Sequence, residues 1–250
     1  MPITASTLYR DSYNFLRNQL GSVVLISLLT AFIAVILNHA FAPDSDQISL
    51  LNASINDLNQ TSGISMFQAM QQMSPEQQML ILKKSASGTF SSLVGNVLLI
   101  GGIMTLIRLV SQGTRTSALR CIGLSAPVLP RLALLMIIVS FLTSFGFVLL
   151  IAPGVILMII LSLSPVITVS DNIGIFKSIK ISAKLTFSNA RLVVPAIMMW
   201  IASEILVGVA VHHLQFLGPE VAEVVLSTLS NFLSAFLLIY LYRLYSKLRG

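Results

Sequence analysis

The chain has 250 residues, of which 55% are hydrophobic and only 10% are charged. Soluble domains carry about a quarter of charged residues, so composition excludes an ordinary soluble fold and makes lipid the solvent for most of the chain. The basic excess, 15 Lys+Arg against 9 Asp+Glu, lies beside apolar segments. Membrane topology demands that placement, so we expect no nucleic-acid binding.

Six segments are apolar and long enough to be transmembrane helices. They are expected at residues 20–41, 90–110, 132–151, 154–170, 192–211 and 221–242. Ala152-Pro153-Gly154 separates the third from the fourth and predicts a tight turn there. The sequence therefore predicts an all-α polytopic membrane protein with six transmembrane helices, forming a single membrane domain over residues 1–250.

Two of these segments allow another interpretation. The first is followed by Ala40-Phe41-Ala42, which imitates a signal-peptide cleavage site, but its apolar run is longer than the usual 7–15 residues. We therefore predict an uncleaved anchor. The fourth is short enough to be re-entrant, and the distribution of charge, given below, favours a true crossing.

Two amphipathic segments precede the first and fifth spans. Thr4–Gln19 gathers Leu8, Phe15 and Leu16 on one helical face and is predicted to lie in the membrane interface. Ile173–Asn189 and nearby Arg191 supply four cations at helical spacing beside an apolar arc, which predicts contact with an anionic leaflet. These candidate lipid-binding residues are Lys177, Lys180, Lys184 and Arg191. The alternative is that they only anchor the topology.

Residues 43–87 form the one substantial polar insertion and are predicted to be a periplasmic helical cap. Its apolar residues between Ile48 and Leu58 recur every three or four positions, which favours a helix. Ser74-Pro75-Glu76-Gln77 has the pattern of a helix start. Methionines at 66, 70, 73 and 79 are interpreted as an ordinary apolar face and not as a copper site, because no His or Cys accompanies them.

Charge orients the chain with both termini in the cytoplasm of a cell with an inner membrane. Six crossings then leave thirteen of the fifteen cations inside and only Lys83 and Lys84 outside. If the fourth segment were re-entrant, the basic residues at 177–191 and the basic C-terminus could not both be cytoplasmic. The order of segments further suggests a threefold repeat, each unit an interfacial helix followed by a hairpin of two spans.

Glu204 is the one ionisable residue deep within a predicted span. Such a carboxylate is costly in lipid and is by default a functional candidate. It could carry protons in a small transporter, or it could be hydrogen-bonded to a polar residue of a neighbouring span. Ser203 and Asn231 are the candidates by residue type.

No cofactor or metal is expected. His39, His212 and His213 fall at predicted outer span ends near several acidic residues, but no metal-binding spacing is present, so an interfacial role is the preferred interpretation. Cys121 is the only cysteine, which excludes an internal disulfide. The chain contains no nucleophile elbow, P-loop or paired catalytic carboxylates, so we expect no enzyme.

Several stretches resemble the YciC family of enterobacterial inner-membrane proteins. They are residues 3–19 (ITASTLYRDSYNFLRNQ), 73–78 (MSPEQQ), 117–130 (SALRCIGLSAPVLP), 190–196 (ARLVVPA) and 228–245 (TLSNFLSAFLLIYLYRLY). The resemblance implies a multi-pass inner-membrane protein and no known activity. The Pro-Gly turn, short span and basic helix are also loosely similar to membrane domains attached to some glycerophosphodiester phosphodiesterases, which hints at lipid-facing work.

The leading hypothesis is a multi-pass protein that acts in envelope or membrane maintenance through contacts with lipid or with partner membrane proteins. The alternative is a small proton-coupled transporter that uses Glu204. A lipid-modifying enzyme is the third class considered, and it lacks a recognisable nucleophile or metal triad.

Overall fold

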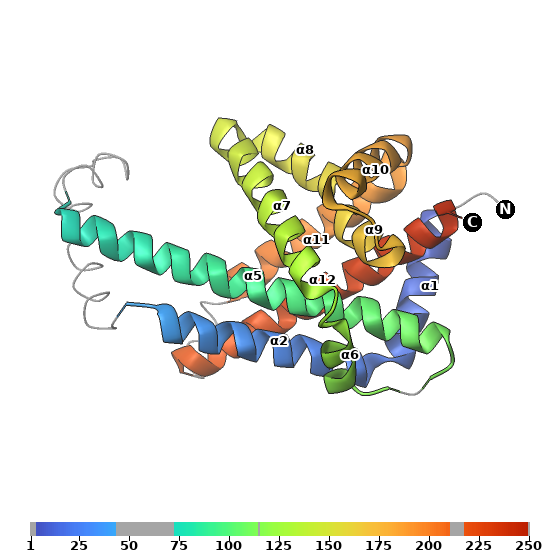
Figure 1. Ribbon diagram of the computed structural model, residues 1–250, viewed down its shortest axis with the longest axis horizontal. Coiled ribbons are helices and arrows are strands. Elements are labelled where there is room, and N and C mark those ends of the chain that lie inside the picture. The colour runs from blue at the N-terminus through green and yellow to red at the C-terminus, as the bar shows by residue number, and fades with distance from the viewer. Residues whose placement is uncertain (1–3, 44–72, 115, 211–217, 250) are drawn as a thin grey trace. The chain divides into compact units, whose positions relative to one another are not determined.

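The structure, a computed structural model, describes residues 4–43, 73–114, 116–210 and 218–249, and in these residues it is helical without strands. Within this described part of the chain, six segments are long and apolar enough to cross a membrane. They are α2 (Leu20–Phe41), α5 (Pro75–Ser111), α7 (Leu129–Leu149), α8 with α9 (Ile151–Leu161 and Ser164–Asp171), α11 (Ala190–Ala210) and α12 (Pro219–Arg249) (Figure 1). Shorter helices α1 (Ala5–Asn18), α6 (Ala118–Ser125) and α10 (Ile175–Ser188) precede three of these spans.

Contacts divide the chain into two compact units. The smaller unit, residues 33–92, includes the end of α2 and the start of α5. There Ser87 Oγ donates to Asn38 Oδ1 at 3.1 Å, and the rings of Phe41 and Phe90 meet edge to face at 5.5 Å between centroids. These contacts hold the two helix ends of this unit against each other.

α5 begins with the capping box that the sequence predicts. Gln77 N–H donates to Ser74 Oγ at 3.3 Å, and Ser74 N–H donates to the Gln77 side chain at 3.0 Å. The helix then continues without a break for 37 residues, about 55 Å at 1.5 Å per residue. One continuous helix therefore joins the end of the expected polar insertion to the second span, and the membrane boundary near residue 90 stays a prediction. The expected helix between Ile48 and Leu58 lies outside the described residues.

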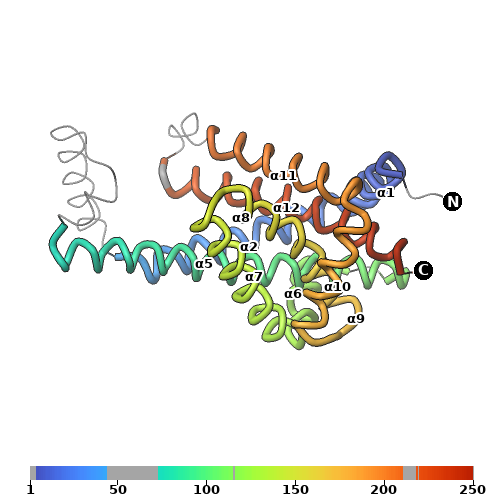
Figure 2. The backbone as a smooth tube through the Cα atoms, turned by 90° about the horizontal axis from the view of Figure 1, so that it is seen from above, coloured from blue at the N-terminus to red at the C-terminus, as the bar shows by residue number. Residues whose placement is uncertain are grey.

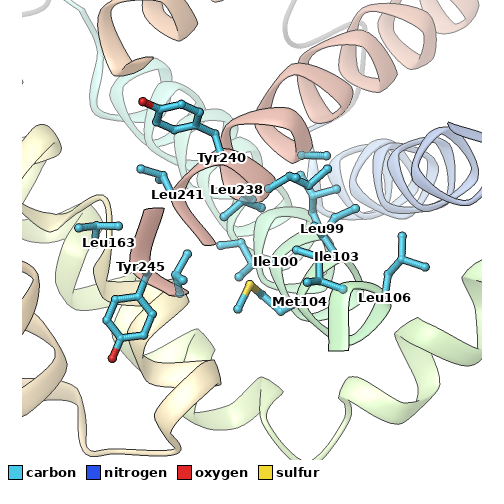
Figure 3. Close-up of a cluster of buried hydrophobic side chains, with 14 of the residues drawn as sticks. Leu99, Ile100, Ile103, Met104, Leu106, Leu163, Leu238, Tyr240, Leu241 and Tyr245 are labelled. Carbon is cyan, nitrogen blue, oxygen red and sulfur yellow. The ribbon is translucent and has the colours of Figure 1, made fainter. Parts of the chain in front are cut away.

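The larger unit, residues 1–32 and 93–250, holds the main apolar core. Figure 3 shows part of this core, where side chains of α5 and α12 meet Leu163 from the junction between α8 and α9. The buried members shown include Leu99, Ile100, Ile103, Met104, Leu238, Tyr240, Leu241 and Tyr245. α12 is thus a central helix of this unit, and its neighbours include α1, α9 and α11.

Close backbone approach joins α7 and α8 into a hairpin. A Cβ on Gly146 would lie 2.9 Å from Gly154 Cα, and a Cβ on Gly154 would lie 2.5 Å from the Phe147 ring. Glycine lets two helices in lipid approach closely enough for dispersion to hold them together. The turn itself is Leu150, with φ −166° and ψ 158°. The expected turn at Ala152-Pro153-Gly154 is wrong by a few residues, because Pro153 and Gly154 lie in the first turn of α8, where proline costs little.

The fourth span is a broken helix. α8 ends at Leu161, and α9 starts at Ser164 with Pro165 in its first turn. Proline supplies no N–H for the preceding turn, so the continuous helix expected over 154–170 is interrupted. α9 ends at Asp171, and the residue that caps it, Asn172, has a left-handed φ of 53° that turns the chain toward α10.

α1 and α10 are built alike. Each has 14 residues and ends at one amide residue with φ near −120°, Gln19 or Asn189, before a long span begins. Each also buries residues at four-residue spacing, which are Leu8, Ser12 and Leu16 in α1 and Ser178, Ser182 and Thr186 in α10. α6 buries Cys121 and Ser125 in the same way but has only eight residues. The threefold repeat stays a prediction for the hairpins themselves.

Candidate lipid-contact surface and intramembrane carboxylate

α10 presents its cations and its largest aromatic side chains to the outside. Lys177, Lys180 and Lys184 are exposed, and Phe176 and Phe187 are 79% and 69% exposed. At 100° per residue both phenylalanines fall beside the lysines and opposite the buried residues. We call these five residues the α10 face. It combines charge with apolar area, which is the composition of a helix that lies in a membrane interface.

The opposite side of α10 is small and polar. Ser178, Ser182 and Thr186 are buried, and Ser182 Oγ donates at 2.6 Å to the carbonyl of Ile160, in the last turn of α8. A carbonyl at a helix end lacks its intrahelical partner, so this bond satisfies it. α10 therefore meets the protein through this buried side and through partly buried Ile175, Ile179 and Leu185, and its phenylalanines remain outside.

Arg191 does not belong to α10. The chain breaks at Asn189, and Arg191 is an exposed residue in the first turn of α11. The sequence prediction placed all four cations on one continuous helix, so the structure separates Arg191 from the three lysines by a change of helix direction.

α1 differs from the prediction in the partner of its apolar face. Leu8, Phe15 and Leu16 are buried, and α1 packs on α12. Tyr9 stacks against Tyr240 at 4.7 Å between centroids, and Arg243 lies 5.4 Å over the Phe15 ring. The apolar face of α1 is thus covered by protein rather than turned to the membrane interface.

Ionic contacts fasten the end of α12 to α1 and α9. Lys247 Nζ lies 2.8 Å from Asp11 Oδ2, and this bond lowers the pKa of the Asp11 carboxyl below its usual value. Asp171 accepts a hydrogen bond from Tyr245 at 2.7 Å and pairs with Arg249. The N-terminal helix and the C-terminal turns of the chain therefore lie at the same end of the larger unit (Figures 1 and 2).

Glu204 is hydrogen-bonded to the neighbouring span, but not to either residue suggested by type. Ser230 Oγ donates to Glu204 Oε2 at 2.7 Å, while Oε1 is buried without a hydrogen-bond partner among the described residues. Ser203 instead donates to Met199 O in its own helix. Asn231 donates to Ser27 O at 3.2 Å and to Thr30 Oγ1 at 3.0 Å, which ties α12 to α2.

One turn along from Glu204, Trp200 Nε1 donates to Ser234 Oγ at 3.1 Å. The two bonds join residues four apart on α11 to residues four apart on α12, so they form a short polar ladder between antiparallel helices. Ladders of this kind hold helices together in lipid, where few other polar partners exist. Sequence reasoning missed Ser230 and Ser234, since a serine in a span usually bonds its own helix and gives no signal of a cross-helix partner.

The other candidate groups are not gathered into a site. No cluster of three His, Cys, Asp or Glu occurs within the described ranges, and His212 and His213 lie outside them. His39 Nδ1 lies 2.9 Å from Val35 O of its own helix. Cys121 is buried beside Thr116, and burial raises the pKa of its thiol, which makes it unreactive.

Comparison with known proteins places the chain in a group of membrane proteins. The model of UPF0259, an uncharacterised protein family, matches residues 1–247. A UPF0259 membrane protein of Serratia proteamaculans is 59% identical over 250 residues, all of both chains. One of Yersinia pestis (strain Pestoides F) is 53% identical over 249 residues, covering all of this chain and 97% of that one. No solved structure matches the chain.

Proposed function

The chain belongs to the UPF0259 family of membrane proteins, and from that premise we propose that it is a non-enzymatic inner-membrane protein that contacts anionic phospholipid through α10. Both termini are cytoplasmic in this proposal, and the contact serves maintenance of the membrane or envelope. The observation that carries the proposal is the α10 face, in which exposed Phe176 and Phe187 flank three exposed lysines.

Two phenylalanines this exposed, on the same face as three lysines, suit a membrane interface, where the rings meet an apolar medium. Burying an aromatic side chain is worth about 1.5–3 kcal/mol relative to leaving it in water. The fold does not gain this for Phe176 or Phe187, which remain exposed while other residues of α10 pack against the protein. In a lipid interface the phenylalanine side chains would gain this burial free energy. The lysines would add roughly 1 kcal/mol each at an anionic surface.

The cytoplasmic assignment is supported by charge. The described segments at the α10 end of the larger unit hold Lys177, Lys180, Lys184, Arg191 and the cations of the last turns of α12. Loops rich in Lys and Arg remain on the cytoplasmic side of inner membranes, where acidic lipids also attract them. Alkaline phosphatase fused after residue 250 should be inactive, and activity of that fusion would contradict the orientation.

The lipid contact is tested by the lipids that the protein retains. The variant Lys177→Gln/Lys180→Gln removes two charges from the α10 face, and Lys83→Gln/Lys84→Gln removes two exposed charges from α5. Each protein is extracted in native membrane discs, and the ratio of phosphatidylglycerol to phosphatidylethanolamine is measured. Two lysines at roughly 1 kcal/mol each correspond to about a 30-fold loss of local affinity.

The proposal expects the anionic enrichment to fall in the α10 variant and to remain in the α5 control. Equal enrichment in all three proteins would refute it. A fall in the control alone would assign the lipid contact to the lysines of α5 instead.

A second candidate function is proton-coupled transport through Glu204. It is favoured by one observation, the buried Oε1 atom that has no partner among the described residues while Oε2 accepts from Ser230. Intramembrane carboxylates often mark proton paths. Glu204→Gln keeps an acceptor for Ser230 but cannot titrate, so it should abolish proton-coupled uptake in proteoliposomes. Absence of uptake by the wild-type protein across a broad substrate panel would exclude the transporter.

A further inference from the structure

A groove lies between α11 and α12, and Tyr9 of α1 also lines it. It has a volume of about 210 Å³. Its walls are Ala196, Met199, Trp200 and Ser203 from α11 and Leu233, Phe236, Leu237 and Tyr240 from α12. Both helices are candidate spans, so lipid is the medium that meets the groove. We propose that this groove binds one acyl chain of a bilayer phospholipid.

Three of the polar groups that line the groove already donate to partners within the protein. Trp200 Nε1 donates to Ser234, Tyr240 Oη donates at 2.9 Å to Leu192 O, and Ser203 Oγ donates to Met199 O. Small-molecule sites normally place a few convergent, unused polar groups among apolar walls to fix a ligand's orientation. Here these three donors are used within the protein, so the groove suits hydrocarbon.

The dimensions fit a chain rather than a compact ligand. The volume is below the roughly 300–1,000 Å³ of drug-sized sites. From Leu233 to Tyr240 the groove follows seven residues of α12, which is about 10 Å along the helix axis. A groove that runs along two candidate transmembrane helices has the direction that an acyl chain already has in the bilayer.

The ends of the groove differ in polarity and give the chain its direction. One end of the groove is formed by Tyr9 and Tyr240. Tyr9 is next to exposed Arg10, and Tyr240 donates to the carbonyl of Leu192, which is next to exposed Arg191. The other end, at Ser203 and Leu233, is in the middle of the spans. The headgroup therefore lies at the end where α1 and the cations are, with the chain tail directed toward Ser203.

This inference goes beyond the lipid contact proposed for α10, because it concerns the hydrocarbon chain and not the headgroup charge. Trp200 lines the groove and is the only tryptophan of the protein. Its fluorescence therefore reports contact with a phospholipid whose acyl chain carries bromine, a short-range quencher. The probe is brominated phosphatidylcholine, titrated into the full chain in detergent.

Ser203→Phe is designed to fill the groove, since the serine lines it and bonds only its own helix. Ala202→Phe is the matched control, because Ala202 is exposed on the same helix and does not line the groove. Both variants retain Trp200. We expect saturable quenching at one lipid per protein in the wild type and in Ala202→Phe, and loss of the saturable component in Ser203→Phe.

Competition by unbrominated phosphatidylcholine provides a readout in the wild type alone, so the test stands even if Ser203→Phe fails to fold. Recovery of fluorescence supports the site. Quenching that rises without saturation, or that competitor lipid does not reverse, would overturn it, as would unchanged saturable quenching in a folded Ser203→Phe. Saturable quenching by brominated phosphatidylglycerol but not by phosphatidylcholine would assign binding to headgroup charge and also reject the acyl-chain site.

Discussion

Lys247 Nζ lies 2.8 Å from Asp11 Oδ2, so the last turns of α12 are bonded to the helix that begins the chain. The two residues are 236 positions apart. The contact brings both termini to one end of the larger unit. A chain that crosses a membrane an even number of times has both termini on the same side, so this arrangement agrees with six crossings.

This pair makes the attachment of α1 depend on pH. The bond to Lys247 lowers the folded-state pKa of Asp11 below the ordinary value of 3.8. A carboxyl with a lowered pKa stabilises the folded state above 3.8, and that stabilisation is lost as the pH falls through the folded-state pKa. Because both side chains are more than a third exposed, we expect only a few tenths of a kcal/mol. Hydrogen exchange of α1 should accelerate in Asp11→Asn at pH 7, and unchanged exchange would contradict the contact.

The glycines of the α7–α8 hairpin should not tolerate a methyl group. Gly146→Ala places a Cβ 2.9 Å from the Gly154 backbone, which has to move, and overpacking of this kind costs about 1–3 kcal/mol. Gly208→Ala is the control, since no atom lies within 4 Å of its Cβ position in α11. We expect thermal unfolding of Gly146→Ala at lower temperature and of Gly208→Ala at the same or higher temperature. A Gly146→Ala protein as stable as the control would show that the helices are farther apart.

The bond between Ser230 and Glu204 should contribute measurably to the packing of α11 on α12. Cross-helix hydrogen bonds in membrane proteins average about 0.6 kcal/mol. Ser230→Ala leaves the carboxyl without its 2.7 Å donor, and we expect a loss of about 0.5–2 kcal/mol in steric-trap unfolding. In a double-mutant cycle with Glu204→Gln, additive losses would mean that the two side chains do not interact.

Substitutions on the buried side of α10 should lower the stability of the fold, whereas substitutions on the exposed α10 face should not. Ser182→Leu puts a large side chain at a fully buried position and removes the bond to Ile160 O, so it should destabilise by roughly 1–3 kcal/mol. Phe187→Ser changes an exposed position and should leave the unfolding free energy within about 0.5 kcal/mol. The reverse order in an unfolding assay would mean that α10 packs through its phenylalanines.

Sequence periodicity located nearly all the spans because apolar length and helix-start residues are local signals. Ser74 and Gln77 form the expected capping box, and α1 and α10 have close to their expected bounds. The turn at Leu150 was misplaced because Pro153 is equally compatible with a turn and with the start of a helix. The break after Leu161 could have been inferred from Pro165.

The candidate sites were harder to predict from the sequence, because they depend on which helices pack against each other. The three lysines are exposed along α10, while their contact with lipid stays a prediction, and their spacing did not indicate that Ser178, Ser182 and Thr186 would be buried. The partner of Glu204 lies 26 residues away on another span. The acyl-chain groove is lined by Tyr9 of α1 and by residues more than 180 positions later in the chain. No local sequence pattern predicts that these distant residues come together.

The most direct test of the lipid-contact function is the environment of Phe176. In a Trp200→Phe background, Phe176→Trp places a single tryptophan on the α10 face, and Tyr13→Trp, at another exposed aromatic, is the control on α1. In proteoliposomes we expect blue-shifted emission from position 176, with stronger quenching by brominated phosphatidylglycerol than by brominated phosphatidylcholine. Emission of a fully water-exposed indole, with no quenching by either lipid, would contradict the account.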